Sequence, residues 1–441
     1  MSRITSEAIA CQTAHVGLPE GFCMLKQAIL VVAALLGAVA AGSVCAAEQP
    51  PADANVPQTL SEYLRQAALN NAGLKAAFEE WKAALEQIPQ AKALPDPKLT
   101  YGYFVRQIAD RQRVGLMQMF PWFGKIAARV DAAAAGAKAA LSRYEAKRIQ
   151  LFSEVKQAFS EYAYLAGATR VARENLALMQ HFEEVARTKY ITAAATHPDI
   201  IRAQIEVARL QNELITLERQ RSPVVARLNA ALNRPAEARL PWPREEPQQP
   251  VELNRDGLMA MLRGRNPELQ AMNFDIERLN SEVAVAKRNF YPDIGIGADW
   301  MAMPMPEGGS EQDVMVGIEL NLPIWRHSYR AGELQARAMA RRARYERKDL
   351  ENSLVARTER ALYEFENSGR EVQLYRDVLV PRAQELVGAS EAAYMAGTID
   401  FLRLIDAQQT LLRFQLARER SRADQQQKLA ELEMLVGADL P

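Results

Sequence analysis

The chain repeats itself. A segment that ends in proline occurs twice, as VGLMQMFPWFGK at 114–125 and as VGIELNLPIWRH at 316–327, so that Pro121 and Pro323 stand 202 positions apart. Three further pairs recur at a similar offset: Asn71-Ala-Gly-Leu74 with Asn266-Pro-Glu-Leu269, Leu94-Pro95-Asp96 with Tyr291-Pro292-Asp293, and Tyr190…Gln204 with Tyr394…Gln408. These nearly constant offsets indicate a tandem duplication, and each half must therefore fold into the same set of elements.

The repeated segment is typical of a strand with one apolar face. Over residues 313–322 apolar side chains alternate with Met315, Gly317, Glu319 and Asn321, which is the period of two that a half-buried strand requires. Pro323 ends the segment because it has no backbone N–H to donate. Similar alternation predicts strands at about 98–107, 113–120 and 293–301. The arms approach the 9–11 residues of a tilted membrane strand, so the sequence predicts two membrane-type β-hairpins.

The rest of each half is predicted to be helical. We expect helices over 59–93, 125–190, 198–233, 258–290, 327–395 and 399–437, with Gly397-Thr398 breaking the last two. A helix of about 65 residues is roughly 100 Å long. Helices of this length cannot bury an apolar face within one compact globule, so we expect them to pack side by side as coiled coils. The shorter helices would stack end to end along the longer ones.

Composition divides the chain into four parts. Residues 1–46 are interpreted as a signal peptide with an N-terminal extension, because Lys26 precedes the apolar run 28–41 and Val44-Cys-Ala46 resembles a cleavage site. A transmembrane helix and lipidation of Cys45 are the alternatives. All three cysteines lie in this part, so the exported chain is expected to lack disulfides. The first repeat then covers 47–239, a proline-rich linker covers 240–252, and the second repeat covers 253–441.

Four strands in one chain cannot close a barrel, and lipid does not tolerate an open sheet edge. Three chains would supply twelve strands, an even number within the known range of membrane barrels. The predicted fold is therefore mainly α with a small β part: a tandem repeat of long helical hairpins and β-hairpins that forms, on trimerisation, a 12-stranded β-barrel. The alternative is a periplasmic coiled-coil spacer that does not conduct.

The sequence offers no set of catalytic residues. Lys plus Arg equals Asp plus Glu, which gives no reason to expect a nucleic-acid partner. His181, His197 and His327 are far apart, and no nucleotide-binding or zinc-protease motif is present. We therefore expect no enzyme activity, no cofactor and no metal site. Methionines at 301, 303 and 305 could bind a soft monovalent metal, but methionine is more often adaptable filler.

The segment Tyr394-Met-Ala-Gly-Thr-Ile-Asp-Phe-Leu-Arg-Leu-Ile-Asp-Ala-Gln408 resembles the periplasmic tip of the TolC-type outer-membrane efflux protein family, the outer-membrane factors of tripartite efflux pumps. The resemblance covers nearly all of the exported chain. It implies a homotrimeric channel in the outer membrane of a Gram-negative bacterium, in which the 12-stranded β-barrel is joined to an α-helical periplasmic barrel. Most of the chain would then lie in the periplasm. The implied partners are a second and third copy of the chain, a periplasmic adaptor protein, an inner-membrane efflux pump and outer-membrane lipid. The run 120–125 is more similar to the heavy-metal efflux branch.

The resemblance also implies where the channel would close. The tip and gate candidates are Tyr394, Gly397, Thr398, Arg403 and Asp406 in the second repeat, and Tyr190, His197 and Asp199 in the first. In this interpretation Gly397-Thr398 is the turn, His197-Pro198 replaces it in the first repeat, and Asp406 belongs to a constricting ring. Arg403 stands where an aspartate is usual, and we hypothesise an Arg403–Asp406 link within or between protomers. Pro121 and Pro323 are expected at the transitions from strand to helix.

Overall fold

The structure is a computed structural model. It describes residues 57–103, 112–193, 195–244, 251–304 and 310–440, and the side chains of 303–311 are outside the description. The elements described below all belong to one compact unit, Val56–Pro441. The predicted signal peptide, its N-terminal extension and Cys45 lie outside the described residues, as do residues 104–107 of the first predicted strand.

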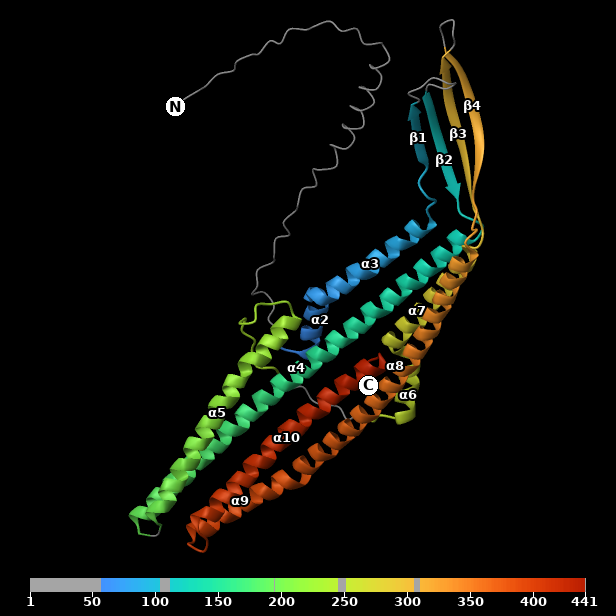
Figure 1. Ribbon diagram of the computed structural model, residues 1–441. Coiled ribbons are helices and arrows are strands. Elements are labelled where there is room, and N and C mark those ends of the chain that lie inside the picture. The colour runs from blue at the N-terminus through green and yellow to red at the C-terminus, as the bar shows by residue number, and fades with distance from the viewer. Residues whose placement is uncertain (1–56, 104–111, 194, 245–250, 305–309, 441) are drawn as a thin grey trace, which may run out of the picture. The chain divides into compact units, whose positions relative to one another are not determined.

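Each half of the chain folds into the same series of elements (Figure 1). The first half contains α2 (Leu60–Asn70), α3 (Ala72–Lys92), β1 (Lys98–Tyr103), β2 (Gln112–Phe120), α4 (Lys125–Ile191) and α5 (His197–Ala231). The second half contains α6 (Arg255–Arg265), α7 (Pro267–Arg288), β3 (Asp293–Pro304), β4 (Ser310–Asn321), α8 (Arg326–Leu374), the π-helical turn η2 (Tyr375–Leu379), α9 (Val380–Met395) and α10 (Phe401–Val436).

The predictions of one helix over 59–93 and one over 258–290 are wrong, because an asparagine divides each of these segments into two helices. Asn71 ends α2 and caps α3, its side chain accepting a hydrogen bond from the Leu74 backbone N–H at 2.9 Å. Asn266 does the same between α6 and α7. The amide groups also donate to carbonyls near the ends of distant helices, Asn71 to Ala231 at 3.0 Å and Asn266 to Leu435 at 2.8 Å. In each half, one asparagine thus links the end of one helix, the start of the next and the C-terminal end of a third through its backbone and side chain.

The long helix predicted at 327–395 is interrupted near Pro381. Proline has no N–H for the hydrogen bond that would continue the helix. The N–H of Val380, the residue immediately before it, bonds to the carbonyl of Tyr375, five residues back, which is π-helical geometry. The chain remains helical on both sides of the turn, so α8, η2 and α9 run on in one direction (Figure 1).

The four strands form one antiparallel sheet in the order β1-β2-β3-β4. The central pair, β2 and β3, comes from different repeats and joins the two hairpins. Leu116 on β2 pairs with Leu99 on β1 and with Ala298 on β3, and Ala298 in turn pairs with Val316 on β4. Within the described sheet, β1 and β4 each have a strand on one side only.

The helices form a layer with the sheet at one end and the helical turns at the other (Figure 1). Near the sheet the contacts run in the order α3, α4, α7, α8, and near the turns they run α5, α4, α10, α9. As predicted, two shorter helices lie along one long helix, α3 and α5 both packing on α4. The interior of the far half is apolar and includes Phe182, Leu210, Phe401 and Leu404, all at most 1% exposed.

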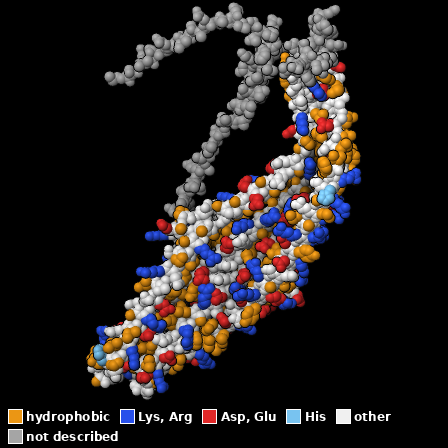
Figure 2. All heavy atoms as spheres, in the orientation of Figure 1, with side chains coloured by type: hydrophobic (Ala, Val, Ile, Leu, Met, Phe, Trp, Pro, Cys, Tyr) orange, Lys and Arg blue, Asp and Glu red, His pale blue; other side chains and the backbone are white. Residues whose placement is uncertain are grey.

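Mixed charges cover the helices, with Lys and Arg interspersed among Asp and Glu (Figure 2). Many pairs are one helical turn apart, as in Arg342–Glu346 and Arg360–Glu364. Exposed pairs at this spacing add only about 0.3–0.5 kcal/mol each. Among the described residues, no helix combines the length and the hydropathy needed to cross a membrane.

Candidate functional site

The two faces of the sheet differ in chemistry. The apolar face carries large side chains that are more than half exposed, such as Leu99 (74%), Val316 (73%) and Ile318 (74%). The polar face carries glycines together with charged residues and methionines. The register places these side chains on the polar face: Lys98, Thr100, Arg113, Met117, Met119, Asp299, Met301, Met315 and Glu319. An exposed apolar face of this extent marks a surface that another apolar medium or chain covers.

A forked ion pair crosses the polar face between β2 and β3. The Nε of Arg113 donates to Oδ1 of Asp299 at 3.0 Å, and its Nη2 donates to Oδ2 at 2.7 Å. Gly115 makes room for the pair, since a Cβ there would lie only 2.1 Å from Asp299 Oδ1. Neither residue was a sequence candidate, because the two are 186 positions apart and strand register brings them together.

The first strand-to-helix transition is held by a buried lysine. After Pro121 the chain turns through Gly124, whose φ of +80° lies in the left-handed region, and enters α4 at Lys125. The Nζ of Lys125 donates to Asp293 Oδ1 at 2.7 Å and to the Tyr291 carbonyl at 3.1 Å. The Trp122 N–H donates to the same carboxylate oxygen at 2.9 Å, and its ring stacks on Tyr291.

The second transition, at Pro323, is built differently. Pro323 follows the end of β4 and precedes α8, but His327, which stands 202 positions after Lys125, is exposed. The neighbouring apolar side chains Leu322, Ile324 and Trp325 are 63%, 69% and 75% exposed. The duplication therefore conserved the position of the proline and not the buried ion pair.

The turn of the second hairpin is formed at Gly397 and Thr398. Gly397 has φ +77°, its N–H bonds to the Tyr394 carbonyl at 3.0 Å, and the Thr398 N–H bonds to the Ala393 carbonyl at 2.9 Å. This pair of bonds is the Schellman motif, in which a left-handed residue ends a helix. The hydroxyl of Thr398 also donates to Ala393. Asp400 then caps α10 by accepting the Arg403 N–H at 3.1 Å.

The turn of the first hairpin differs from the prediction. His197 and Pro198 are the first residues of α5 and do not form the turn. The left-handed residue is Ala193, with φ +58°, and it stands 204 positions before Gly397. Its N–H bonds to the Tyr190 carbonyl at 3.0 Å, as Gly397 does to Tyr394. The prediction failed because alanine rarely adopts this conformation and gives no turn signal.

Asp199 and Tyr190 have local roles at the first turn. The Asp199 carboxylate accepts from the backbone N–H of Thr196 at 3.0 Å and from its hydroxyl at 2.8 Å, completing a capping box at the start of α5. The half-exposed ring of Tyr190 lies 5.8 Å from the ring of His197, centroid to centroid.

Lys189, which sequence analysis did not select, joins the two hairpins. It lies near the end of α4, and its Nζ donates to the carbonyls of Tyr394 and, at 3.1 Å, Met395 at the end of α9. The same ammonium group lies 4.5 Å from the centroid of the Tyr394 ring. Eight residues earlier on α4, His181 Nε2 lies 3.1 Å from Glu391 Oε1 on α9. A cation at a helix C-terminus is favoured by the helix dipole, so Lys189 binds the second hairpin where its charge is most stabilising.

Tyr394 is 4% exposed and packs its ring against Phe401 at 5.3 Å. Burial raises the pKa of its phenol above the ordinary value, and the nearby Asp199 carboxylate raises it further. Among the described residues its hydroxyl oxygen has no hydrogen-bond partner. Tyr394 therefore connects the end of α9, the start of α10 and the first turn.

Arg403 and Asp406 are both exposed on α10, and no ion pair between them forms within the described chain. The duplication places Asp199 opposite Arg403 and Arg202 opposite Asp406, so the order of the charges is reversed between the halves. In the first half the pair is in contact, with 4.0 Å between Arg202 and Asp199. The hypothesised Arg403–Asp406 link is thus absent within one chain, and a link between protomers is still a proposal.

Both lateral edges of the helical layer expose large apolar side chains. Within the described chain α3 and α5 pack mainly on α4, α8 packs on α7 and α10, and α9 packs on α10. The edges of the layer are therefore α3 and α8 near the sheet, and α5 and α9 near the turns. Exposed residues include Leu85 on α3 and Tyr345 on α8, and Ile205 on α5 and Leu386 on α9. In the sheet the corresponding edges are β1 and β4. The described chain therefore has two lateral edges at each of three levels: the sheet, the helices next to it and the helices near the turns.

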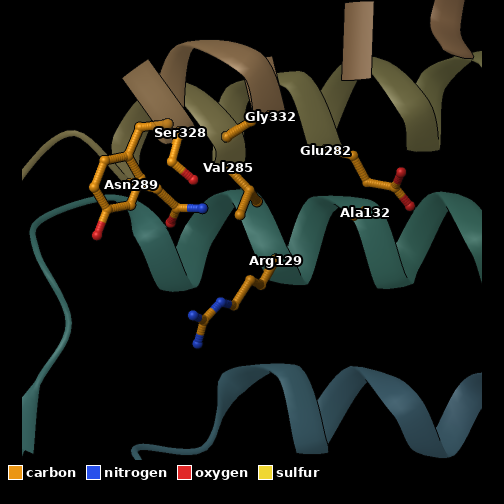
Figure 3. A pocket seen from close by; sticks show the side chains of 9 residues that line it. Arg129, Ala132, Glu282, Val285, Asn289, Ser328 and Gly332 are labelled. Atoms are coloured by element: carbon orange, nitrogen blue, oxygen red, sulfur yellow. The ribbon is translucent and has the colours of Figure 1, made fainter. Parts of the chain in front are cut away.

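A crevice of about 460 Å³ lies between α4, α7 and α8 near the sheet (Figure 3). It is lined by one base and one acid, Arg129 and Glu282, with Asn289 and Ser328 and small residues such as Gly332. In the described part of the chain no group of three or more His, Cys, Asp or Glu side chains could hold a metal ion.

One family matches the chain twice. The sequence model described as Outer membrane efflux protein matches residues 63–234 and 258–438, one match in each half. Two relatives are 23% identical to the chain. Nodulation protein T of Rhizobium leguminosarum bv. trifolii aligns over 86% of this chain and 85% of its own length, and the cobalt-zinc-cadmium resistance protein CzcC of Cupriavidus metallidurans over 82% and 85%.

Solved structures have the same fold. The outer-membrane channel OprN superposes with a TM-score of 0.74 at 18% identity, over 87% of this chain and 90% of the channel chain. At this identity the likeness establishes the architecture of sheet and helical layer. It confirms the predicted fold class, mainly α with a small β part.

Proposed function

The chain belongs to the outer membrane efflux protein family, and we propose that three copies close into one continuous channel. Membership makes it an outer-membrane efflux channel, with most of its chain on the periplasmic side. The family consists of channels and not of enzymes, and its members form homotrimers that work with periplasmic adaptors and inner-membrane pumps.

The observation that carries the proposal is that every level of the chain ends in two different open edges. These are β1 and β4 in the sheet, α3 and α8 below it, and α5 and α9 near the turns. When one edge of a chain contacts the opposite edge of the next copy, the interface is head-to-tail. Such interfaces form a ring if the rotation that relates one copy to the next returns to the first copy. Four strands per copy and three copies give the twelve strands of a closed barrel.

In this ring the apolar face of the sheet contacts lipid and the polar face lines the lumen. Each of the four parts of the chain has a role in this channel. Residues 1–46 direct export, residues 47–239 and 253–441 each supply one β-hairpin and one helical hairpin, and the linker 240–252 joins them. The partners of this chain are two further copies, a periplasmic adaptor protein, an inner-membrane pump and outer-membrane lipid.

The helical turns form the closable end. Lys189 holds the two hairpins of one chain together, and the exposed Asp406 side chains of three copies form an acidic ring. Charged rings of this kind attract cations and repel anions. The turns are shaped by Tyr190 and Asp199 in the first repeat and by Tyr394, Gly397 and Thr398 in the second, while His197 begins α5 beside Tyr190. Arg403 contacts the neighbouring protomer. Pro121 and Pro323 mark where barrel changes to tunnel.

Cell fractionation followed by native mass spectrometry tests the trimer. We expect the protein in the outer-membrane fraction as a complex of three chains that resists dodecyl sulfate until it is heated, because a closed barrel has no free strand edges. Recovery as monomers in the periplasmic fraction would instead favour the spacer protein, which needs no barrel.

A further inference from the structure

The exposed apolar surface of β4 continues past the end of the strand. Leu322, Ile324 and Trp325, which lead into α8, are 63%, 69% and 75% exposed. In the first repeat Phe123, which stands 202 positions before Trp325, is 83% exposed. Membrane barrels carry girdles of aromatic residues where lipid meets water. An exposed aromatic residue at both strand-to-helix transitions therefore indicates that the membrane boundary lies at this level.

The second transition adds exposed positive charge. Arg326 and Arg330 lie in the first two turns of α8, and both are exposed. The residues at the equivalent positions of the first repeat are Gly124 and Ala128. The two halves thus share the aromatic residue, and the second half alone places two arginines beside it.

These two charges are not balanced within the described chain. The sequence has no Asp or Glu from 320 to 332, and neither Arg326 nor Arg330 has an ion-pair partner among the described residues. Further along α8, by contrast, Arg337 pairs with Glu333 at 2.5 Å. The arginines at the start of α8 are therefore available to an anion from outside the chain.

Both arginines lie on the side of α8 that faces away from the crevice. Ser328 and Gly332 line the crevice (Figure 3). Each stands two residues after one of the arginines, and two residues are about 200° apart around a helix. Arg326 and Arg330 therefore lie on the opposite surface of the helical layer.

The crevice lies on the side of the layer that continues the polar face of the sheet. Arg129 lines the crevice from α4, one helical turn after Lys125. The Nζ of Lys125 donates to Asp293 Oδ1 at 2.7 Å, and Asp293 lies on the polar face with Asp299, six residues further along β3. In the proposed ring this side faces the lumen. The two arginines of α8 therefore face outward, directly below the lipid-facing surface.

We propose that Arg326 and Arg330 bind the phosphate of an anionic phospholipid in the periplasmic leaflet, with Trp325 against its acyl chains. The inference rests on the proposed function, because the closed barrel places the apolar face in lipid. Guanidinium groups donate charge-assisted hydrogen bonds to phosphate oxygens, and basic clusters beside a membrane attract anionic lipids. The two arginines are one helical turn apart, about 6 Å along the axis, so both reach the same headgroup.

Lipid retention by the purified trimer tests the inference. The trimer is mixed with equal amounts of anionic phosphatidylglycerol and zwitterionic phosphatidylethanolamine, and the bound lipids are counted by native mass spectrometry. We expect the wild type to retain phosphatidylglycerol preferentially, one molecule per chain. R326Q/R330Q should weaken the binding of phosphatidylglycerol at least about tenfold, because each arginine near a membrane surface adds to the attraction. Retention of phosphatidylethanolamine should not change.

R337Q/R341Q is the matched control. It removes two exposed arginines with the same spacing on α8, about 16 Å further from the sheet, so the preference of the wild type should remain. Equal retention of the two lipids by the wild type, or the same loss in both double variants, would overturn the inference. Displacement of phosphatidylglycerol by an equal concentration of glycerol 3-phosphate would also overturn it, because the site would then recognise free phosphate. Wild-type chains that form no trimer would refute the proposed function instead.

Discussion

Val316→Arg is expected to abolish assembly of the trimer in the outer membrane. Val316 is 73% exposed near the middle of β4, on the apolar face. An arginine facing lipid near the bilayer midplane costs about 2–4 kcal/mol, and the ring would carry it three times. Heat-modifiable trimers should disappear from the outer-membrane fraction, as measured by semi-native electrophoresis.

Gly317→Arg is the control one residue away. Its side chain would lie on the polar face, where nothing is found within 4 Å of a Cβ on Gly317. Adjacent strand residues face opposite sides of the sheet, so the same charge should be tolerated in the lumen. Loss of trimers in the Gly317 variant and normal trimers in the Val316 variant would reverse the assignment of the two faces.

Lys125→Met is expected to lower the stability of the protein, with an effect second only to that of Val316→Arg. The side chain of Lys125 is 5% exposed and that of its partner Asp293 is 26% exposed. Removing the ammonium leaves the carboxylate with the Trp122 N–H as a donor. Breaking a buried pair costs about 3–5 kcal/mol, and the partial exposure of Asp293 reduces this to roughly 2–3 kcal/mol. The temperature at which the trimer dissociates in dodecyl sulfate should fall by several degrees.

His327→Met controls for the change to methionine, because the duplication places His327 opposite Lys125 and it is exposed. Surface substitutions usually change stability by no more than about 0.5 kcal/mol, so the dissociation temperature should stay that of the wild type. Equal temperatures for all three proteins would mean that the Lys125–Asp293 pair does not hold the transition.

The duplication, the strands and the long helices were predictable, because they depend on local periodicity. Alternation along 313–322 places Val316 and Gly317 on opposite faces, and the observed register agrees. The turn at Gly397 was also predictable, since glycine is the residue that most readily adopts a left-handed conformation. The breaks at Asn71 and Asn266 were not predicted, although both residues mark the repeat. The apolar pattern continues across each asparagine, so the sequence on its two sides looks like one continuous helix.

Other parts of the candidate site had no local signal. Lys92 and Lys287 also lie in the last turn of a helix, so the position of Lys189 gives no signal of its own, and its contact with Tyr394 spans 205 positions. The first turn was misplaced because Ala193 adopts a conformation that its side chain disfavours. Such features follow from tertiary structure and cannot be inferred from spacing along the chain.

Single-channel conductance of the purified trimer in planar bilayers tests the central claim, that three chains enclose a tunnel whose helical turns hold it closed. We expect low conductance for the wild type. Lys189→Gln should raise it, because the variant loses the charge that binds the Tyr394 and Met395 carbonyls. Arg187→Gln, which alters an exposed pair with Glu183 on α4, should conduct as the wild type does. Intact trimers in which Lys189→Gln and wild type conduct equally would contradict the account.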